Sequence, residues 1–322
     1  MKSIPCLTLL TAASAILVPS PSGPYHMRLQ SITDPRRPAD PLDPNDHGHG
    51  RRILFSIFLP VEKSGRPCPS ITVPYMTPKV AADYGGQAAE VGLDDGLFSS
   101  FDMQLCDLVK LNPCGGGKGR RKRCEISRQP GPRGSHCRPP ARSRFRRVPW
   151  ALLDRFRLDL GKMAVFAHSV GGGAAATLAR NDNRVLGGVD FDGQLVEAIR
   201  SQGLSRPFLL AGRYGHSAAN STDHTWNQFW PRLAGPRVEL AIHGTAHASY
   251  TDRPLLVGAL GLPGAVLDQF AGEIGSVKGT ELEGIVDGVL ASFFDFVLSS
   301  KTQRLVRLPR VYSAVLITCS NL

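Results

Sequence analysis

The chain has 322 residues, of which 42% are hydrophobic and 20% are charged, and it contains 34 glycines and 25 prolines. These values exclude a collagen, a coiled coil and a wholly disordered chain. After residue 20, no apolar run approaches the roughly 20 residues that a membrane span needs, so a polytopic membrane protein is excluded as well. A chain of this length can bury a sizeable core.

The net charge of +11 comes from one segment. Residues 118–147 contain twelve Lys or Arg and one acidic residue, Glu125, whereas the charges of the remaining chain balance. Phe145 is the one aromatic residue of this basic tract, and no nucleic-acid-binding motif accompanies it. We therefore interpret the tract as a solvated basic loop and expect no nucleic-acid partner. The alternative interpretation of this tract is that the chain is a basic binding protein.

The first 20 residues are typical of a secretory signal. Lys2 precedes an uncharged stretch that runs to Tyr25, with an apolar part from Ile4 to Val18 and a candidate cleavage site at Ala13-Ser14-Ala15. We predict a signal peptide over residues 1–20 and a secreted protein; an apolar arm packed on the domain is the alternative. An even number of cysteines would remain, which suits an oxidising compartment: Cys68, Cys106, Cys114, Cys124, Cys137 and Cys319.

In chain order, the N-terminal half gives few clear elements. Pro19–Gly50 is rich in Pro, Asp and His and is predicted to be extended, and Arg52–Pro60 is the first convincing strand. Residues 61–94 resemble loops, and Leu97–Leu111 favours a short helix. Asn112–Pro149 has no apolar run of even four residues, which predicts loop or disorder.

From residue 150 onward, strands and helices alternate, which favours a mostly parallel sheet with flanking helices. The predicted elements are a helix over Trp150–Leu160, strands over Met163–Phe166, Leu186–Phe191, Pro207–Gly212 and Arg237–His243, an Ala-rich helix that ends near Arg180, a short aromatic helix over Thr225–Leu233 and a closing helix over Leu282–Leu298.

The sequence AVFAHSVGGG at residues 164–173 has the form of a nucleophile elbow. Ser169 lies at the apex of a sharp turn between a strand and a helix, so the residues two before and two after it must be small. Ala167 and Gly171 occupy these positions. The backbone N–H of Val170, at the start of the helix, is expected to stabilise an oxyanion.

A serine nucleophile needs a base. His247 lies in a loop directly after the last predicted strand, where the base of this arrangement is expected. His243 is its rival at the strand end, whereas His216 and His224 follow the preceding strand and come too early.

The base in turn needs a carboxylate that orients it. Asp192 directly follows the strand that ends at Phe191, at the carboxyl edge of the sheet where such sites lie. Asp190 is one pleat deeper within that strand, and Asp223, after the next strand, is the competing candidate.

Four motifs between residues 162 and 254 resemble the platelet-activating factor acetylhydrolase family, especially its fungal members. They are the elbow, Asp190-Phe191-Asp192-Gly193, Arg206-Pro207-Phe208-Leu209-Leu210 and His247-Ala248-Ser249-Tyr250-Thr251-Asp252.

The resemblance implies an α/β-hydrolase domain over residues 21–322, with residues 113–149 as a basic Gly/Pro-rich insert. It implies hydrolysis of the short sn-2 acyl ester of ether or oxidised phospholipids without calcium, by Ser169, His247 and Asp192. No cofactor or metal is implied. The expected partners are a phospholipid or small ester and, peripherally, a lipid surface.

The chain departs from the family between Pro60 and Trp150. The family carries there a strand and a glycine-rich turn that supply the second oxyanion donor, followed by a further strand, and we expect this chain to lack that part of the central sheet. A deletion or a misplaced exon boundary would explain the composition of the segment. Two alternatives to the acetylhydrolase therefore stay open: a general carboxylesterase of the same fold, and a catalytically inert product.

Overall fold

A computed structural model describes residues 15–20, 25–33, 54–62, 69–90, 92–106, 159–219 and 223–322 of the chain. They belong to two compact units, Met1–Leu158 and Asp159–Leu322. Within the described residues, no helix has the length and apolar character that crossing a membrane requires. The predicted Trp150–Leu160 helix, up to residue 158, and the basic tract lie outside the described residues.

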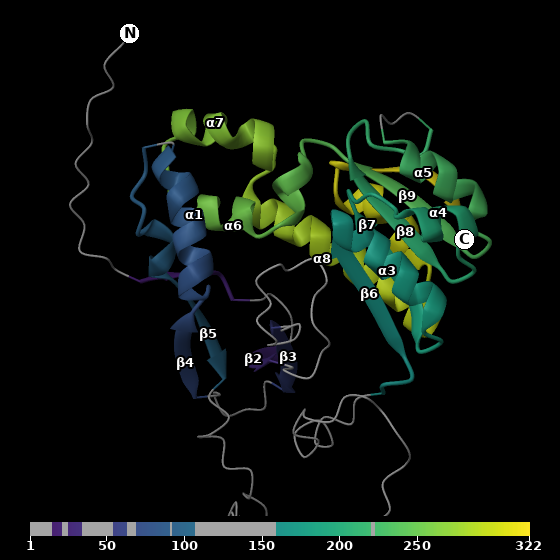
Figure 1. Cartoon of the computed structure of the whole chain (residues 1–322), viewed down its shortest axis with the longest axis horizontal. Coiled ribbons are helices and arrows are strands. Elements are labelled where there is room, and N and C mark those ends of the chain that lie inside the picture. Colours follow the sequence, from purple (N-terminus) through teal and green to yellow (C-terminus); the bar gives the residue numbers. More distant parts are fainter. Residues whose placement is uncertain are drawn as a thin grey trace, which may run out of the picture. The chain divides into compact units, whose positions relative to one another are not determined.

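The first unit contains two small sheets and a helix (Figure 1). In the three-stranded sheet, β5 (Phe101–Cys106) lies between β1 (Ile16–Leu17) and β4 (Ser70–Pro74). Strands β2 (Tyr25–Thr33) and β3 (Leu54–Glu62) form a separate antiparallel pair. The remaining elements are α1 (Pro78–Glu90) and the 3₁₀ turn η1 (Leu97–Ser100).

Two predictions for this unit are wrong. Residues 61–94, predicted as loops, contain β4 and α1, and the predicted helix over 97–111 is a single 3₁₀ turn followed by β5. Helix α1 buries only small residues, Ala81, Gly85 and Ala88, and a Cβ at Gly85 would collide with the backbone of Asp95. A helix that packs through such close approach lacks the large apolar stripe by which sequence patterns are recognised.

The second unit is built on a five-stranded sheet in the order β10-β9-β8-β7-β6. The alternation predicted from the sequence is confirmed, and four strands run parallel. These are β6 (Met163–His168), β7 (Val185–Phe191), β8 (Phe208–Arg213) and β9 (Arg237–Ile242). The architecture is thus a mostly parallel sheet flanked by helices, as predicted.

Helices cover both faces of this sheet (Figure 1). On β8, Phe208 and Leu210 face one buried cluster, with side chains from α3, α4 and α5, whereas Leu209 faces another, with side chains from α8. This alternation follows from the two-residue period of a strand. The helices are α3 (Val170–Asn181), α4 (Glu197–Gln202), α5 (His224–Phe229), α6 (Arg253–Ala259), α7 (Gly264–Ile274), α8 (Gly279–Ser299), α9 (Gln303–Val306) and α10 (Leu308–Val311).

The C-terminal end of the unit differs from the sequence prediction. The predicted closing helix is α8, but α9, α10 and a last strand, β10 (Val315–Asn321), follow it. Strand β10 pairs antiparallel with β9 and forms one edge of the sheet. Sequence analysis missed it because it follows two short helices at the end of the chain, outside the strand–helix alternation.

Strand β6, which leads into the elbow, forms the other edge among the described strands, where it pairs with β7 alone. In keeping with this edge position, Phe166 is 54% exposed, and the centroid of its ring lies 6.2 Å from that of Phe294 in α8. Residues 107–158, where the sequence departs from the family, lie outside the described residues.

Candidate active site

Ser169 lies in a strained turn between β6 and α3. Its backbone has φ 58° and ψ −133°, a conformation that residues other than glycine rarely adopt and that costs on the order of 1–3 kcal/mol. A Cβ at Gly171 would lie 3.0 Å from the Cβ of Ala167, so the residues two before and two after Ser169 face each other, as the elbow pattern predicts. The turn projects the serine out of the strand end.

Two further glycines, Gly172 and Gly193, allow the elbow to pack closely against the end of β7. A Cβ at Gly193 would overlap the carbonyl oxygen of Ser169, and a Cβ at Gly172 would overlap the carboxylate of Asp190. The backbone N–H of Ser169 also donates to the carbonyl of Phe191, at 3.0 Å. These close approaches fix the height of the serine relative to the residues that follow β7.

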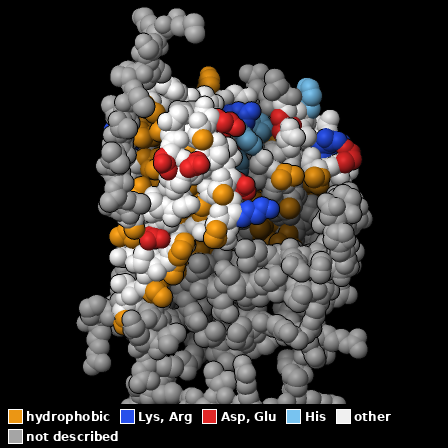
Figure 2. Space-filling view, turned by 60° about the vertical axis from the view of Figure 1, so that its left-hand side comes forward, with side chains coloured by type: hydrophobic (Ala, Val, Ile, Leu, Met, Phe, Trp, Pro, Cys, Tyr) orange, Lys and Arg blue, Asp and Glu red, His pale blue; other side chains and the backbone are white. Residues whose placement is uncertain are grey.

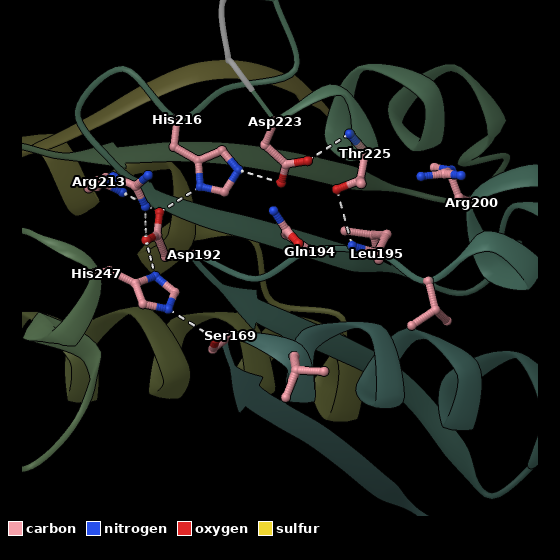
Figure 3. Close-up of a pocket in the computed structure, with 12 residues that line it drawn as sticks. Ser169, Asp192, Gln194, Leu195, Arg200, Arg213, His216, Asp223, Thr225 and His247 are labelled. Atoms are coloured by element: carbon pink, nitrogen blue, oxygen red, sulfur yellow. Dashed lines mark hydrogen bonds and ion pairs between the residues drawn. The ribbon is translucent and has the colours of Figure 1, made fainter.

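The structure brings Ser169, His247 and Asp192 together (Figure 3). The Ser169 hydroxyl donates to Nε2 of His247 at 2.9 Å, and Nδ1 of His247 donates to Oδ2 of Asp192 at 2.7 Å. Asp192 directly follows β7, and His247 begins the 3₁₀ turn η3 (His247–Tyr250) after β9. The three side chains therefore have the hydrogen-bonded order that a serine nucleophile, its base and an orienting carboxylate require.

His247 is held by its backbone as well as by its ring. The Ala246 N–H donates to Ser249 Oγ at 2.8 Å, and the Ser249 hydroxyl donates to the carbonyl of Ile274 at 2.7 Å. From the elbow, Nε2 of His168 lies 2.9 Å from the carbonyl oxygen of His247, and the two rings are 4.6 Å apart. Burial, together with the charge of His247, lowers the pKa of His168, so this ring stays neutral and donates one hydrogen bond.

Asp192 is buried and accepts hydrogen bonds on both oxygens. Oδ1 accepts from His216 Nδ1 at 2.6 Å and from the Arg213 backbone N–H at 3.2 Å, and Oδ2 accepts from the Arg213 guanidinium as well as from His247. Burial acts to raise the pKa of Asp192, but the hydrogen bonds from His216 and His247 outweigh it and bring that pKa to about 2. The carboxylate is therefore charged at neutral pH.

Two of the rival residues belong to the same network instead of replacing its members. Nε2 of His216 lies 3.1 Å from Oδ2 of Asp223, so His216 connects Asp223 to Asp192. Asp223 does not orient His247; its other oxygen accepts from the Thr225 N–H and caps α5. The signal in the sequence was that His216 and Asp223 both follow β8, at the edge where β7 also ends.

The other rivals lie elsewhere. His243 is exposed, with its ring 4.5 Å from that of Tyr214, and His224 is the first residue of α5. Asp190 is completely buried beneath the elbow, where Oδ1 accepts the Gly193 N–H at 3.0 Å and Oδ2 has no partner among the described residues. Burial raises the pKa of Asp190 to about 8, so its carboxyl is mostly protonated at neutral pH and unsuited to orient a histidine.

A cavity of about 520 Å³ opens above Ser169 (Figure 3). Within it, Val170 supplies the backbone N–H at the start of α3, which has no acceptor within the helix and is placed for an oxyanion. Among the described residues, we identify no second donor of this kind. The lining residues are Ser169, Val170, Asp192, Gln194, Leu195, Val196, Arg200, Arg213, His216, Asp223, Thr225 and His247.

The described surface carries neither a metal site nor a one-signed charge patch on the face in view. Within the described residues, no group of three His, Cys, Asp or Glu side chains is arranged to hold a metal ion. Figure 2 shows blue basic and red acidic side chains next to one another, with apolar side chains between them.

Comparison with known proteins shows what this chain is similar to. No protein-family model matches it. It is distantly homologous to a probable 1-alkyl-2-acetylglycerophosphocholine esterase of Arthroderma benhamiae, with 26% identity over 162 residues. That alignment covers 46% of this chain and 41% of the relative, so the chain matches less than half of the relative's length.

A solved structure shares the fold. The ferulic acid esterase from Streptomyces cinnamoneus superposes with a TM-score of 0.59 and 19% identity, over 95% of this chain and all of the other. At this identity the likeness establishes the fold, which is that of an α/β-hydrolase as predicted.

Proposed function

We propose that the protein is a serine carboxylic ester hydrolase. The observation that carries the proposal is the hydrogen-bonded sequence from Ser169 through His247 to Asp192 at the floor of a cavity. His247 accepts the proton of the Ser169 hydroxyl as Oγ attacks the acyl carbonyl, and Asp192 stabilises the imidazolium that forms. The Val170 N–H faces the developing oxyanion.

The remaining steps use the same groups. His247 returns its proton to the leaving alcohol, which releases the alcohol and leaves the acyl group on Ser169. The ring then accepts a proton from a water that attacks the acyl carbonyl, and the carboxylic acid leaves as Oγ is protonated again.

We infer the substrate to be the short sn-2 acyl ester of a platelet-activating factor-like or oxidised phospholipid. The printed name of the distant relative supports this class. The cavity also combines apolar Leu195 and Val196 with the guanidinium of Arg200, which suits an ester with a nearby phosphate. Val170, 77% exposed beside the cavity, gives its rim an apolar residue for contact with a lipid surface.

A general carboxylesterase is the second candidate. Both guanidinium groups of the cavity already have acidic partners, Arg213 with Asp192 and Arg200 with Glu197. An uncharged ester would leave these ion pairs undisturbed, so this pairing favours a substrate without a phosphate.

Secretion is a further part of the proposal. It rests on the first 20 residues, where Lys2 precedes an uncharged, mostly apolar stretch, and on Cys106, which is disulfide-bonded.

The test is hydrolysis of p-nitrophenyl acetate by the full chain beside Ser169→Ala. We expect the variant to lose roughly 10⁴- to 10⁶-fold in kcat at an unchanged melting temperature. A soluble, folded wild type without activity would contradict the proposal and favour the inert alternative.

A second assay separates the two substrate classes. It compares a 1-alkyl-2-acetyl phospholipid with its 2-hexadecanoyl analogue and with a neutral acetyl ester. For the phospholipid proposal we expect at least about a tenfold preference in kcat/KM for the acetyl phospholipid over both. Equal rates on the two acetyl esters would identify the general carboxylesterase.

A further inference from the structure

His216 is a buried histidine whose two ring nitrogens both face carboxylates. Nδ1 lies 2.6 Å from Asp192 Oδ1, and Nε2 lies 3.1 Å from Asp223 Oδ2 (Figure 3). A carboxylate oxygen accepts hydrogen bonds, so His216 Nδ1–H donates to Asp192 Oδ1, and the ring bridges the two carboxyl groups.

The surroundings of His216 leave its ring little freedom. Trp226 stacks on it with ring centroids 4.0 Å apart and an interplanar angle of 23°. The Trp226 indole N–H donates to the carbonyl of Gly193 at 2.7 Å, so the same tryptophan also fixes the backbone directly after Asp192. Asp223 is itself fixed as the N-cap of α5, through Thr225.

The contacts of Asp192 explain why a second histidine matters. Oδ2, the oxygen that orients His247, also accepts from the guanidinium of Arg213, whose side chain is 41% exposed. Without a strong donor on Oδ1, Arg213 can draw the carboxylate away from His247. A short hydrogen bond from His216 to Oδ1 opposes that rotation.

We propose that His216, anchored by Asp223, is a positioning residue that holds the Asp192 carboxylate in the orientation His247 needs. The inference rests on the proposed esterase function. It gives the second histidine and second aspartate a role that acts through Asp192 and touches neither the substrate nor Ser169.

The experiment uses two substitutions that divide the functions of the ring. His216→Asn places an amide near the position of Nδ1 and keeps a donor for Asp192, whereas His216→Gln reaches the position of Nε2 and keeps only the contact with Asp223. We expect His216→Gln to lower kcat for p-nitrophenyl acetate by about 10- to 100-fold with KM within about twofold. His216→Asn should restore kcat to within about fivefold of wild type.

A purely structural role predicts a different result. If the role were purely structural, both His216→Gln and His216→Asn would have a lower melting temperature and the two variants would have the same kcat. That result would overturn the proposal. Asp223→Asn is the safeguard against misfolding, because asparagine also caps helices; we expect a smaller loss, about 3- to 10-fold in kcat. His243→Asn, at an exposed ring outside the network, is the matched control and should not change kcat.

A spectroscopic measurement separates this inference from the esterase proposal. In chain labelled with ¹⁵N-histidine, the proton on His247 Nδ1 that bonds to Asp192 gives a low-field NMR signal whether or not an ester is turned over. We expect His216→Gln to shift or remove this signal and His216→Asn to retain it. An unchanged signal in His216→Gln would overturn the positioning role, whereas an inactive wild type that shows the expected shifts would refute only the esterase.

Discussion

Asp190 and Asp192 lie two residues apart at the end of β7, Asp190 beneath the elbow and Asp192 above it. The surroundings of these two carboxyl groups shift their pKa values in opposite directions. Above, Asp192 accepts four hydrogen bonds, three of them from side chains, and its pKa falls to about 2. Beneath, Oδ1 of Asp190 accepts the Gly193 N–H, its Oδ2 has no partner among the described residues, and burial raises its pKa to about 8. Neighbouring donors, more than depth alone, decide which of two buried acids carries charge.

The largest effect that this comparison predicts is on activity. Asp192→Asn would present an amide N–H₂ or a neutral carbonyl to His247, so the ring no longer has a charged acceptor for Nδ1–H. We expect kcat for p-nitrophenyl acetate to fall by about 10⁴-fold. The measurement is steady-state kinetics with Asp190→Asn as control, which should stay within about tenfold of wild type. The reverse ranking of the two variants would show that the orienting acid is Asp190.

The next effect is on stability and concerns the tight layer beneath the elbow. Gly172→Ala forces a Cβ into the carboxyl of Asp190, so we expect the free energy of unfolding to fall by about 1–3 kcal/mol. Gly284→Ala in α8 is the matched control, because a Cβ there meets nothing within 4 Å. Denaturant titration should show Gly284→Ala at least as stable as wild type. Equal losses in both variants would mean that the layer is not tightly packed.

The smallest effect is on the pH dependence of stability. Because burial raises the pKa of Asp190 to about 8 in the folded chain, its stabilising contribution is complete below the unfolded pKa near 3.8 and is lost as the pH rises through 8. Asp190→Asn should therefore remove a decline in the free energy of unfolding as the pH rises from 4 toward 8. Denaturation curves across this range check it, and parallel wild-type and variant profiles would contradict it.

For Asp192, the contribution to the free energy of unfolding changes with pH in the opposite direction. Its folded pKa of about 2 lies below the unfolded value, so its stabilising contribution is present above pH 4 and is lost as the pH falls toward 2. Asp192→Asn should therefore flatten the acid side of the profile, whereas Asp190→Asn flattens the neutral side.

Sequence patterns predicted the second unit well because its strands are short apolar runs that alternate with helices. The strands β6 to β9 lie within one or two residues of their predicted bounds, and the elbow residues Ala167, Ser169 and Gly171 could be recognised because one strained turn imposes their sizes. Strand β10 escaped notice because an antiparallel edge strand carries no such context. In the first unit, α1 was missed because it packs through small residues.

The site could be predicted only as far as chain order carries information. Order along the chain pointed to Asp192 and His247, but it presented His216 and Asp223 as competitors. Their actual relation depends on β7 and β8 being neighbours in the sheet, which brings the residues after both strands into one hydrogen-bonded row. Such a contact between side chains from different loops leaves no periodic trace in a sequence.

The backbone of Ser169 has a consequence for how this protein would respond to selection in the laboratory. A glycine adopts φ 58° without strain, whereas a serine at this φ is strained by on the order of 1–3 kcal/mol. A screen that rewarded heat resistance alone would therefore enrich glycine at position 169 and discard the proposed nucleophile. At this position stability and reactivity pull the sequence in opposite directions.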